Sequence, residues 1–384
     1  MSSKNGLSSQ LVWYLSGFIV FWLFFCIYTF SLRDLNLTLF NTPALQQFQD
    51  QLAYIGYFQR PISTLTFLVL CIFLFYYYLK ILAKKSIKNI KPIGIVILFI
   101  IITGIFAYPA FSHDIFNYLF NAKMILVYGK DPHVITANQF LFDPWTRFMH
   151  NVHTAAPYGY GFTITSLIPM IISLPNFTIS LWLMKLFISI FFILESILIY
   201  KISETLYPGE KIRRVCIFVF NPLLLIETVI VGHNDSLMMA AVLFSIWRLL
   251  QKKSTKNMAL AIFSWIYSIS IKYASVVLLP FLMLIKKVDI FTYGGLAMLL
   301  VLMTRPGQLN SWYLHWGIVL LGLSRKSWAI ALTLLVSLGG LMRYAPYIFT
   351  GNWDAPVQTW RAVILLLPLL LLMSRKVRNY FSIQ

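Results

Sequence analysis

The chain has 384 residues, of which 59% are hydrophobic and only 11% are charged. Soluble domains carry about a quarter charged residues, so this composition excludes an ordinary soluble domain and predicts one polytopic transmembrane domain over residues 1–384. The formal net charge is +19, but lysine and arginine cluster between apolar runs, as they do in cytoplasmic loops. We therefore expect membrane lipids, and no nucleic acid, as partners of these basic clusters.

Apolar runs dominate the chain on both sides of a long polar segment, 111–157. They lie at 11–31, 62–82, 92–110, 158–174, 178–200, 213–231, 234–250, 258–271, 273–285, 289–304, 310–323, 327–349 and 357–374. They predict an all-α bundle of about 11–13 transmembrane helices. Several runs are shorter than the ~20 residues that a bilayer needs, which indicates broken helices around a cavity.

The basic clusters predict the orientation of the chain. If residues 80–91 and the clusters near 211, 252, 286 and 325 are cytoplasmic, both termini are cytoplasmic and the segment 111–157 faces outside. We expect this arrangement in a plasma (inner) membrane. Two apolar runs lie between 157 and 201 where parity needs one crossing, so 158–174 either spans or is re-entrant.

Two helices are expected outside the membrane. Pro43 after an N-cap-like Thr42 predicts an amphipathic helix on the outer surface. A second, juxtamembrane helix is expected to begin near Asp114, where the positive helix end favours a carboxylate, and to stop at Gly129.

Asp114 and the stretch Gly232–Asp235 are the strongest candidates for chemistry. Taken alone, Asp114 is equally well explained as an acid at a helix N-terminus, and Asn234 or Asp235 as a helix cap. However, three consecutive polar groups, with Glu227 about two turns earlier, exceed what a cap requires.

Charges inside or near apolar runs are costly and often functional, which adds Lys272 and Arg305. No spacing resembles a zinc motif and no nucleotide-binding loop is present. We expect neither a metal site nor a cofactor, with a divalent cation left open as an alternative.

These stretches together resemble a known family. Ser112-His113-Asp114 with Tyr118, Gly129-Lys130-Asp131-Pro132, Pro157-Tyr158-Gly159, Asn221-Pro222 with Gly232 to Asp235, and Trp312-Tyr313-Leu314-His315-Trp316 occur in the order of its motifs. The family is the polyprenyl-phosphomannose-dependent α-mannosyltransferases of bacterial lipoglycan synthesis, in the glycosyltransferase C (GT-C) superfamily. The mannosyltransferases of GPI-anchor synthesis are more distantly similar. The chain departs from the pattern at His133 and Tyr160, where the family has tyrosine and proline.

The resemblance implies inverting transfer of mannose from a polyprenyl-phosphate donor to a lipid-linked or glycan acceptor on the outer face of the membrane. It assigns the general base to Asp114, within an outer catalytic loop of about 111–157. The remaining candidates are expected to bind substrate: His113, Tyr118, Tyr158, Glu227, His233, Asn234, Asp235, Lys272 and Arg305. A transporter or flippase is the main alternative, because broken helices with intramembrane charges fit it too. A glycan ligase or polymerase that uses a lipid diphosphate is the other.

Overall fold

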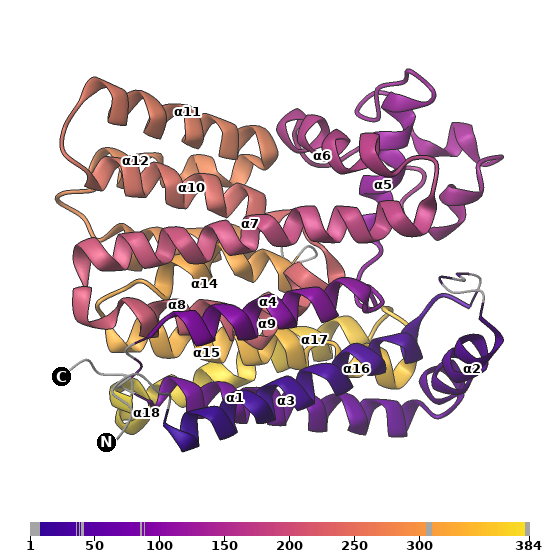
Figure 1. Cartoon of the computed structure of the whole chain (residues 1–384), viewed down its shortest axis with the longest axis horizontal. Coiled ribbons are helices and arrows are strands. Elements are labelled where there is room, and N and C mark those ends of the chain that lie inside the picture. Colours follow the sequence, from indigo (N-terminus) through magenta and orange to yellow (C-terminus); the bar gives the residue numbers. More distant parts are fainter. Residues whose placement is uncertain are drawn as a thin grey trace.

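The computed structural model describes residues 8–35, 37, 39, 42–84, 87, 89–304 and 309–380. Every regular element in these residues is a helix, which confirms the predicted all-α class. The long helices run roughly parallel to one another (Figure 1). α1 begins and α18 lies at one end of this bundle, whereas α2 and α5 lie at the opposite end.

The amino-terminal helices follow the predicted runs closely. They are α1 (Ser9–Tyr28), η1 (Thr29–Leu32), α2 (Pro43–Phe58), α3 (Arg60–Leu82) and α4 (Lys91–Phe106). α2 begins directly after Thr42, with Pro43 in its first turn. The amphipathic helix predicted there is confirmed.

The polar segment and the run after it fold as short helices. They are α5 (Asp114–Leu126), η2 (Ala137–Phe140), η3 (Pro144–Phe148) and α6 (Tyr160–Ser173). The prediction that a helix begins at Asp114 is confirmed, and Gly129 follows its end with a left-handed φ of 61°. α6 has 14 residues, or about 21 Å of helix, which is less than the ~30 Å of a bilayer core.

The centre of the chain contains the longest helix and a broken one. The elements are α7 (Phe177–Leu206), η4 (Pro208–Glu210), α8 (Lys211–Val219), α9 (Pro222–Leu225), η5 (Ile226–Val231), α10 (Asp235–Leu250), α11 (Thr255–Ile271), η6 (Tyr273–Leu278) and α12 (Leu279–Met283). η5 is a π-helical turn, a rare form that is frequent at functional sites.

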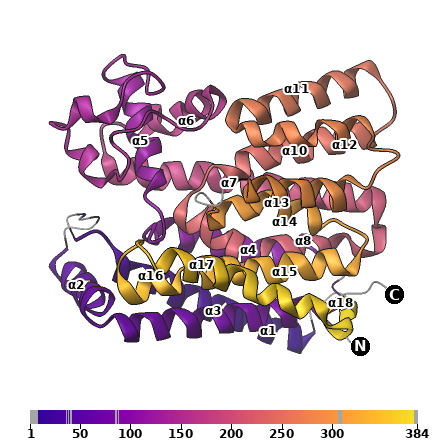
Figure 2. The ribbon, with the colours of Figure 1, turned by 180° about the vertical axis from the view of Figure 1, so that it is seen from behind.

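The carboxy-terminal part fills the other face of the bundle. Its elements are η7 (Ile290–Gly294), α13 (Gly295–Met303), η9 (Ser311–Tyr313), α14 (Leu314–Leu321), α15 (Ser327–Met342), α16 (Ala345–Thr350), α17 (Val357–Leu366), η10 (Leu367–Met373) and α18 (Arg375–Tyr380). Figure 2 shows α13 and α14 on the side turned away in Figure 1.

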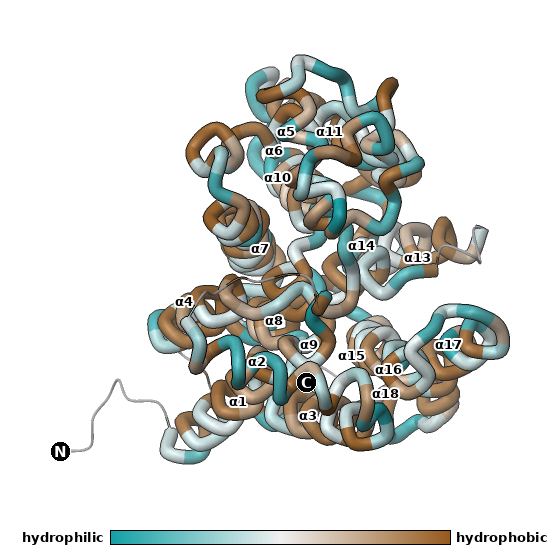
Figure 3. Tube along the Cα trace, turned by 90° about the vertical axis from the view of Figure 1, so that its right-hand side faces the viewer, coloured by the Kyte–Doolittle hydropathy of each residue, from teal (hydrophilic) through white to brown (hydrophobic). Residues whose placement is uncertain are grey.

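Within the described residues, four helices are long and apolar enough to cross a membrane: Ser9–Leu32, Arg60–Leu82, Phe177–Leu206 and Ser327–Thr350. The pair Pro208–Val219 and Pro222–Val231, bent by 55°, adds a fifth if it is one span. Other apolar helices, among them α4, α6 and α13, have only 10–17 residues. Many of the predicted 11–13 crossings are thus short pieces, as their lengths indicated. Hydrophobic residues dominate the helices and polar ones the connections (Figure 3).

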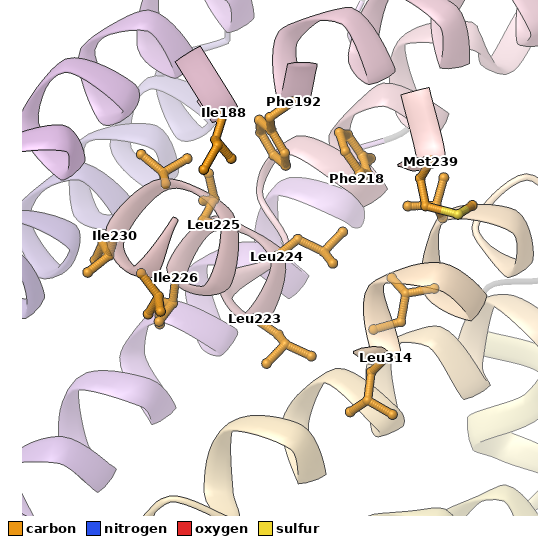
Figure 4. Packing of buried hydrophobic residues seen from close by; sticks show 14 of the residues in the cluster. Ile188, Phe192, Phe218, Leu223, Leu224, Leu225, Ile226, Ile230, Met239 and Leu314 are labelled. Carbon is orange, nitrogen blue, oxygen red and sulfur yellow. The ribbon is translucent and has the colours of Figure 1, made fainter. Parts of the chain in front are cut away.

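α9 and the start of η5 lie inside the hydrophobic core. Leu223, Leu224, Leu225 and Ile226 are all fully buried, as expected for a helix that is apolar all round. Figure 4 shows them surrounded by side chains of α7, α8, α10 and α14. This packing fixes the segment that leads directly to Gly232–Asp235.

Lys185 of α7 holds the end of α4. Its side chain is fully buried, and its Nζ donates to the carbonyl oxygens of Gly104 at 2.9 Å and Ala107 at 2.6 Å. The last carbonyls of a helix have no partner within it, so Lys185 caps the helix that leads into the loop before Asp114.

Replacement of Lys185 by methionine should lower the free energy of unfolding by about 2 kcal/mol. The Gly104 carbonyl keeps the Ala107 N–H, but the Ala107 carbonyl loses the Lys185 donor, and an unpaired buried carbonyl costs about 1–3 kcal/mol. Thermal unfolding in detergent measures this change. Lys201→Met is the matched control, because Lys201 is on the same helix but exposed. Equal melting temperatures for the two variants would contradict the capping role.

Candidate active site

A cavity of about 420 Å³ brings together segments that are far apart in the sequence. Its wall is formed by one face of α5, the loop before α6, the start of α10 and η6, the end of α13, and η9 with α14. The lining residues are Asp114, Asn117, Tyr118, Asn121, Met149, Asn151, Thr154, Ala155, Ala156, Pro157, Tyr158, Asn234, Lys272, Tyr273, Ala274, Val301, Leu302, Thr304, Trp312, Tyr313 and Trp316.

Asp114 is the carboxylate of this cavity. It is the first residue of α5, and its backbone N–H donates to the Ser112 hydroxyl at 3.2 Å. Its side chain remains 31% exposed and lines the cavity. The surrounding protein raises the pKa of the Asp114 carboxyl to about 6 through desolvation, against the opposing charge of Lys272. A carboxyl with such a pKa can act as a base near neutral pH.

One face of α5 supplies further polar groups. Asn117 and Asn121 lie three and seven residues after Asp114, so the three side chains share a helix face and all line the cavity. The Asn121 amide donates to the Tyr158 hydroxyl, and the Tyr118 ring packs edge-on against Tyr158 at 5.2 Å. Tyr118 and Tyr158, both predicted to bind substrate, thus form one aromatic side of the wall.

Gly232 reverses the chain between η5 and α10. Its φ of 84° is in the left-handed region, which glycine adopts without steric cost. A Cβ there would also lie 2.6 Å from Cδ1 of Ile115. The backbone N–H of His233 donates to the Glu227 carbonyl at 3.0 Å, which closes the turn and presents His233, Asn234 and Asp235 to the site.

Neither Asn234 nor Asp235 caps α10. Asn234 occupies the N-cap position without a side-chain cap bond, and both polar atoms of its buried amide have no hydrogen-bond partner within the described structure. Asp235 Oδ1 instead accepts from Lys272 Nζ at 2.6 Å and from Trp316 Nε1 at 2.5 Å. The cap interpretation of these two residues is therefore wrong. Asn234 borders the cavity with a buried donor and a buried acceptor that are both unused in the described structure.

Side chains of the stretch Trp312–Trp316 contact the ionisable residues of the site. Trp312 stacks on the His233 ring at 4.2 Å, and Trp316 donates to Asp235. The Lys272 ammonium lies 5.1 Å from the Tyr313 ring centroid and 5.8 Å from that of Trp316. Such cation–π contacts hold an ammonium in place without neutralising it.

Four of the predicted site residues that the structure describes lie outside the cavity wall: His113, Glu227, His233 and Asp235. Glu227 and His233 are buried behind Asp114, with His233 Nδ1 3.7 Å from Asp114 Oδ2 and His233 Nε2 3.5 Å from Glu227 Oε2. His113 stacks on His150 at 3.8 Å and binds the Phe148 carbonyl at 3.0 Å through Nδ1. Burial lowers the pKa of His113 to about 4, and its contacts are those of a loop anchor.

Arg305, also predicted to bind substrate, lies outside the described residues.

Other residues of the site were not predicted from the sequence. Asn117 and Asn121 carried a usable signal, because their spacing from Asp114 places them on its helix face. Tyr344 carried none: it follows α15, and its hydroxyl donates to Glu227 Oε1 at 2.8 Å only because the fold brings the two segments together.

Within the part of the chain that the structure describes, no three or more His, Cys, Asp or Glu side chains converge as metal ligands would. The charged side chains that line the cavity there are Asp114 and Lys272.

Comparison with known proteins supplies the family. The family model of the N-terminal domain of alpha-(1->6)-mannopyranosyltransferases matches residues 40–287, more than half of the chain. No curated protein and no solved structure matches this chain significantly. The matched region contains Asp114, Asn234 and Lys272, and it ends before Trp312. The chain belongs to the alpha-(1->6)-mannopyranosyltransferase family and is a membrane glycosyltransferase that transfers mannose.

Proposed function

We propose that the chain transfers mannose, with inversion, from a polyprenyl-phosphate donor to a hydroxyl of a lipid-linked or glycan acceptor on the outer face of the plasma membrane. The observation that carries this proposal is that the Asp114 carboxylate and the Lys272 ammonium line one cavity, together with Asn117, Asn121 and Asn234. This set provides a base, a cation for a phosphate, and amides for sugar hydroxyls.

In the reaction, the acceptor hydroxyl oxygen attacks the anomeric carbon from the face opposite the phosphate. The bond from this carbon to the phosphate oxygen breaks, its electron pair stays on the phosphate, and the acceptor proton passes to Asp114. The leaving group needs no protonation, so one carboxylate is enough, unlike the paired acids of inverting hydrolases. Lys272 stabilises the charge that grows on the phosphate. The proposed chemistry requires no resident metal or cofactor.

The two sides of the cavity fit the two substrates. Tyr273, Ala274, Val301 and Leu302 line the same cavity as Lys272 and offer an apolar surface, which suits a polyprenyl chain whose phosphate reaches the ammonium. Asn151 and the residues Thr154–Pro157 of the loop before α6 line the cavity as well, and we assign this part of the wall to the acceptor.

The distribution of basic residues indicates how the chain is oriented in the membrane. Basic clusters follow α3, α7 and α10, at the end of the bundle where α1 begins (Figure 1). By the positive-inside rule that end is cytoplasmic, with both termini, so that α5 and the cavity face outside. A transporter or flippase, the alternative function, has no support from the family match.

Asp114→Asn should reduce mannose transfer by at least about a hundredfold, because a general base contributes ~10²–10⁴ in rate. The assay uses membranes that contain the chain, radiolabelled polyprenyl-phosphate mannose and a glycolipid extract. Asp131→Asn is the matched control: Asp131 belongs to the same outer segment but does not line the cavity, and its variant should keep most activity. Transfer by the Asp114 variant at a tenth or more of the wild-type rate would place the base elsewhere.

The rate should also depend on pH through Asp114. Only the ionised carboxylate accepts a proton, and desolvation raises its pKa to about 6, so kcat/KM should be constant above that pH and fall by about tenfold per pH unit below it. An ordinary aspartate, with a pKa of about 3.9, would keep full activity to about pH 5. A profile between about pH 4.5 and 8 separates the two.

Lys272→Met should reduce kcat by about a hundredfold, the effect of removing one group that stabilises transition-state charge. The change also leaves Asp235 without its cation, which by itself could destabilise the protein. The double variant Lys272→Met with Asp235→Asn removes that buried charge and should recover the melting temperature without recovering transfer. Recovery of both would show that Lys272 acts only as the partner of Asp235.

A further inference from the structure

Behind Asp114, a row of polar side chains extends into the protein. Asp114 Oδ2 lies 3.7 Å from His233 Nδ1, and His233 Nε2 lies 3.5 Å from Glu227 Oε2. The Tyr344 hydroxyl then donates to Glu227 Oε1 at 2.8 Å. His233 is 2% exposed, and Glu227 and Tyr344 are each 1% exposed, so the row runs from the cavity wall into the core.

The atoms that face one another along this row have no hydrogen-bond partner elsewhere in the described structure. In the described structure, both ring nitrogens of His233 and Oε2 of Glu227 are buried without a hydrogen-bond partner. The gaps of 3.7 Å and 3.5 Å are slightly longer than hydrogen bonds but too short for a water between the atoms. Catalytic hydrogen bonds are often this long in substrate-free sites and tighten when substrate binds.

The chemistry of the groups fixes where the protons are. An ionised Asp114 can only accept hydrogen bonds, so His233 must carry its proton on Nδ1. Burial holds the pKa of His233 well below its ordinary value, so the ring is neutral and Nε2 is an acceptor. The partner of Nε2 must then donate, which requires a proton on Oε2 of Glu227, while Oε1 accepts from Tyr344. Every polar atom between Asp114 and Tyr344 is then satisfied.

The surroundings hold His233 in this orientation. Its ring stacks on Trp312 with an interplanar angle of 18°. Its backbone is fixed by the left-handed turn at Gly232 and by the bond to the Glu227 carbonyl. The imidazole thus has little freedom to turn away from Asp114.

We propose that His233, Glu227 and Tyr344 form a buried positioning chain for the base: His233 donates from Nδ1 to Asp114, protonated Glu227 holds that tautomer, and Tyr344 orients Glu227. This inference rests on the proposed role of Asp114. It assigns His233 and Glu227 to the base rather than to the substrate, in agreement with their place outside the cavity wall.

The tautomer can be measured without activity. Solid-state NMR of the ¹⁵N-histidine-labelled chain in bilayers, with His233 identified by difference from the His233→Asn variant, should show a protonated Nδ1 and a bare Nε2 at neutral pH. The opposite tautomer, or a doubly protonated ring, would overturn the proposal. If the wild type transfers no mannose, the proposed function fails. The NMR measurement still tests whether His233, Glu227 and Tyr344 form the positioning chain.

Kinetics of two isosteric variants provide the second test. Asparagine places its amide where Nδ1 stands, and glutamine places it where Nε2 stands. His233→Asn keeps a donor for Asp114 and should leave the acid limb of the pH profile unmoved. His233→Gln should raise that limb by about one pH unit, because a carboxylate that loses a donor gains pKa. We expect its kcat to fall about tenfold to hundredfold, the size of effect known for outer partners of metal ligands. KM should not change, because the substituted residue does not line the cavity.

Glu227→Gln still offers an N–H to Nε2 and should retain more activity than Glu227→Ala. The matched control is His315, a buried histidine 2.9 Å from Glu195 that does not line the cavity. The Asn and Gln variants of His315 should lower the melting temperature. The pH at which activity falls on the acid side of the profile should be the same for both variants. Equal limbs for the two His233 variants, or a rise in KM alone, would refute the positioning chain and indicate packing or substrate contact.

Discussion

The reversal at Gly232 is the constraint on which the rest of the site depends. Backbone groups at membrane depth must find partners inside the protein, and here the π-helical turn η5 and the left-handed glycine provide them. The same turn aligns Glu227 with His233, brings Asn234 to the cavity wall and places Asp235 against Lys272. The apolar packing of Leu223–Ile226 just before it keeps this arrangement rigid (Figure 4).

The two charges of the cavity are tuned in different ways. Asp114 is desolvated, which favours its neutral form and makes it a better proton acceptor near neutral pH. The Lys272 ammonium is held in position by an ion pair with Asp235 and by cation–π contacts with the rings of Tyr313 and Trp316. Because Asp235 also accepts from Trp316, the position of the ammonium depends on a segment beyond the matched region. The site therefore needs the carboxy-terminal helices as well as residues 40–287.

The local features of the chain were readable because they depend on near neighbours. Thr42-Pro43 predicted the start of α2, and the polar break after residue 110 predicted a helix at Asp114. Short apolar runs predicted broken helices, which the structure contains. The cap interpretation of Asn234 and Asp235 was wrong because a distant lysine and tryptophan bind Asp235. The residues next to Asp235 in the sequence do not indicate which distant residues bind it.

The sequence by itself determined the membrane class, the helical content and the candidate status of Asp114 and of the stretch Gly232–Asp235, since each follows from composition, periodicity or local polar groups. Only the tertiary structure decided which polar residues face the cavity and which stand behind it. It placed Lys272 against Asp235, Trp312 on His233 and Tyr344 on Glu227, and it left His113 in a loop contact. The reason is physical: a buried polar group must be satisfied wherever a partner lies in space, and separation along the chain sets no limit on where that partner comes from.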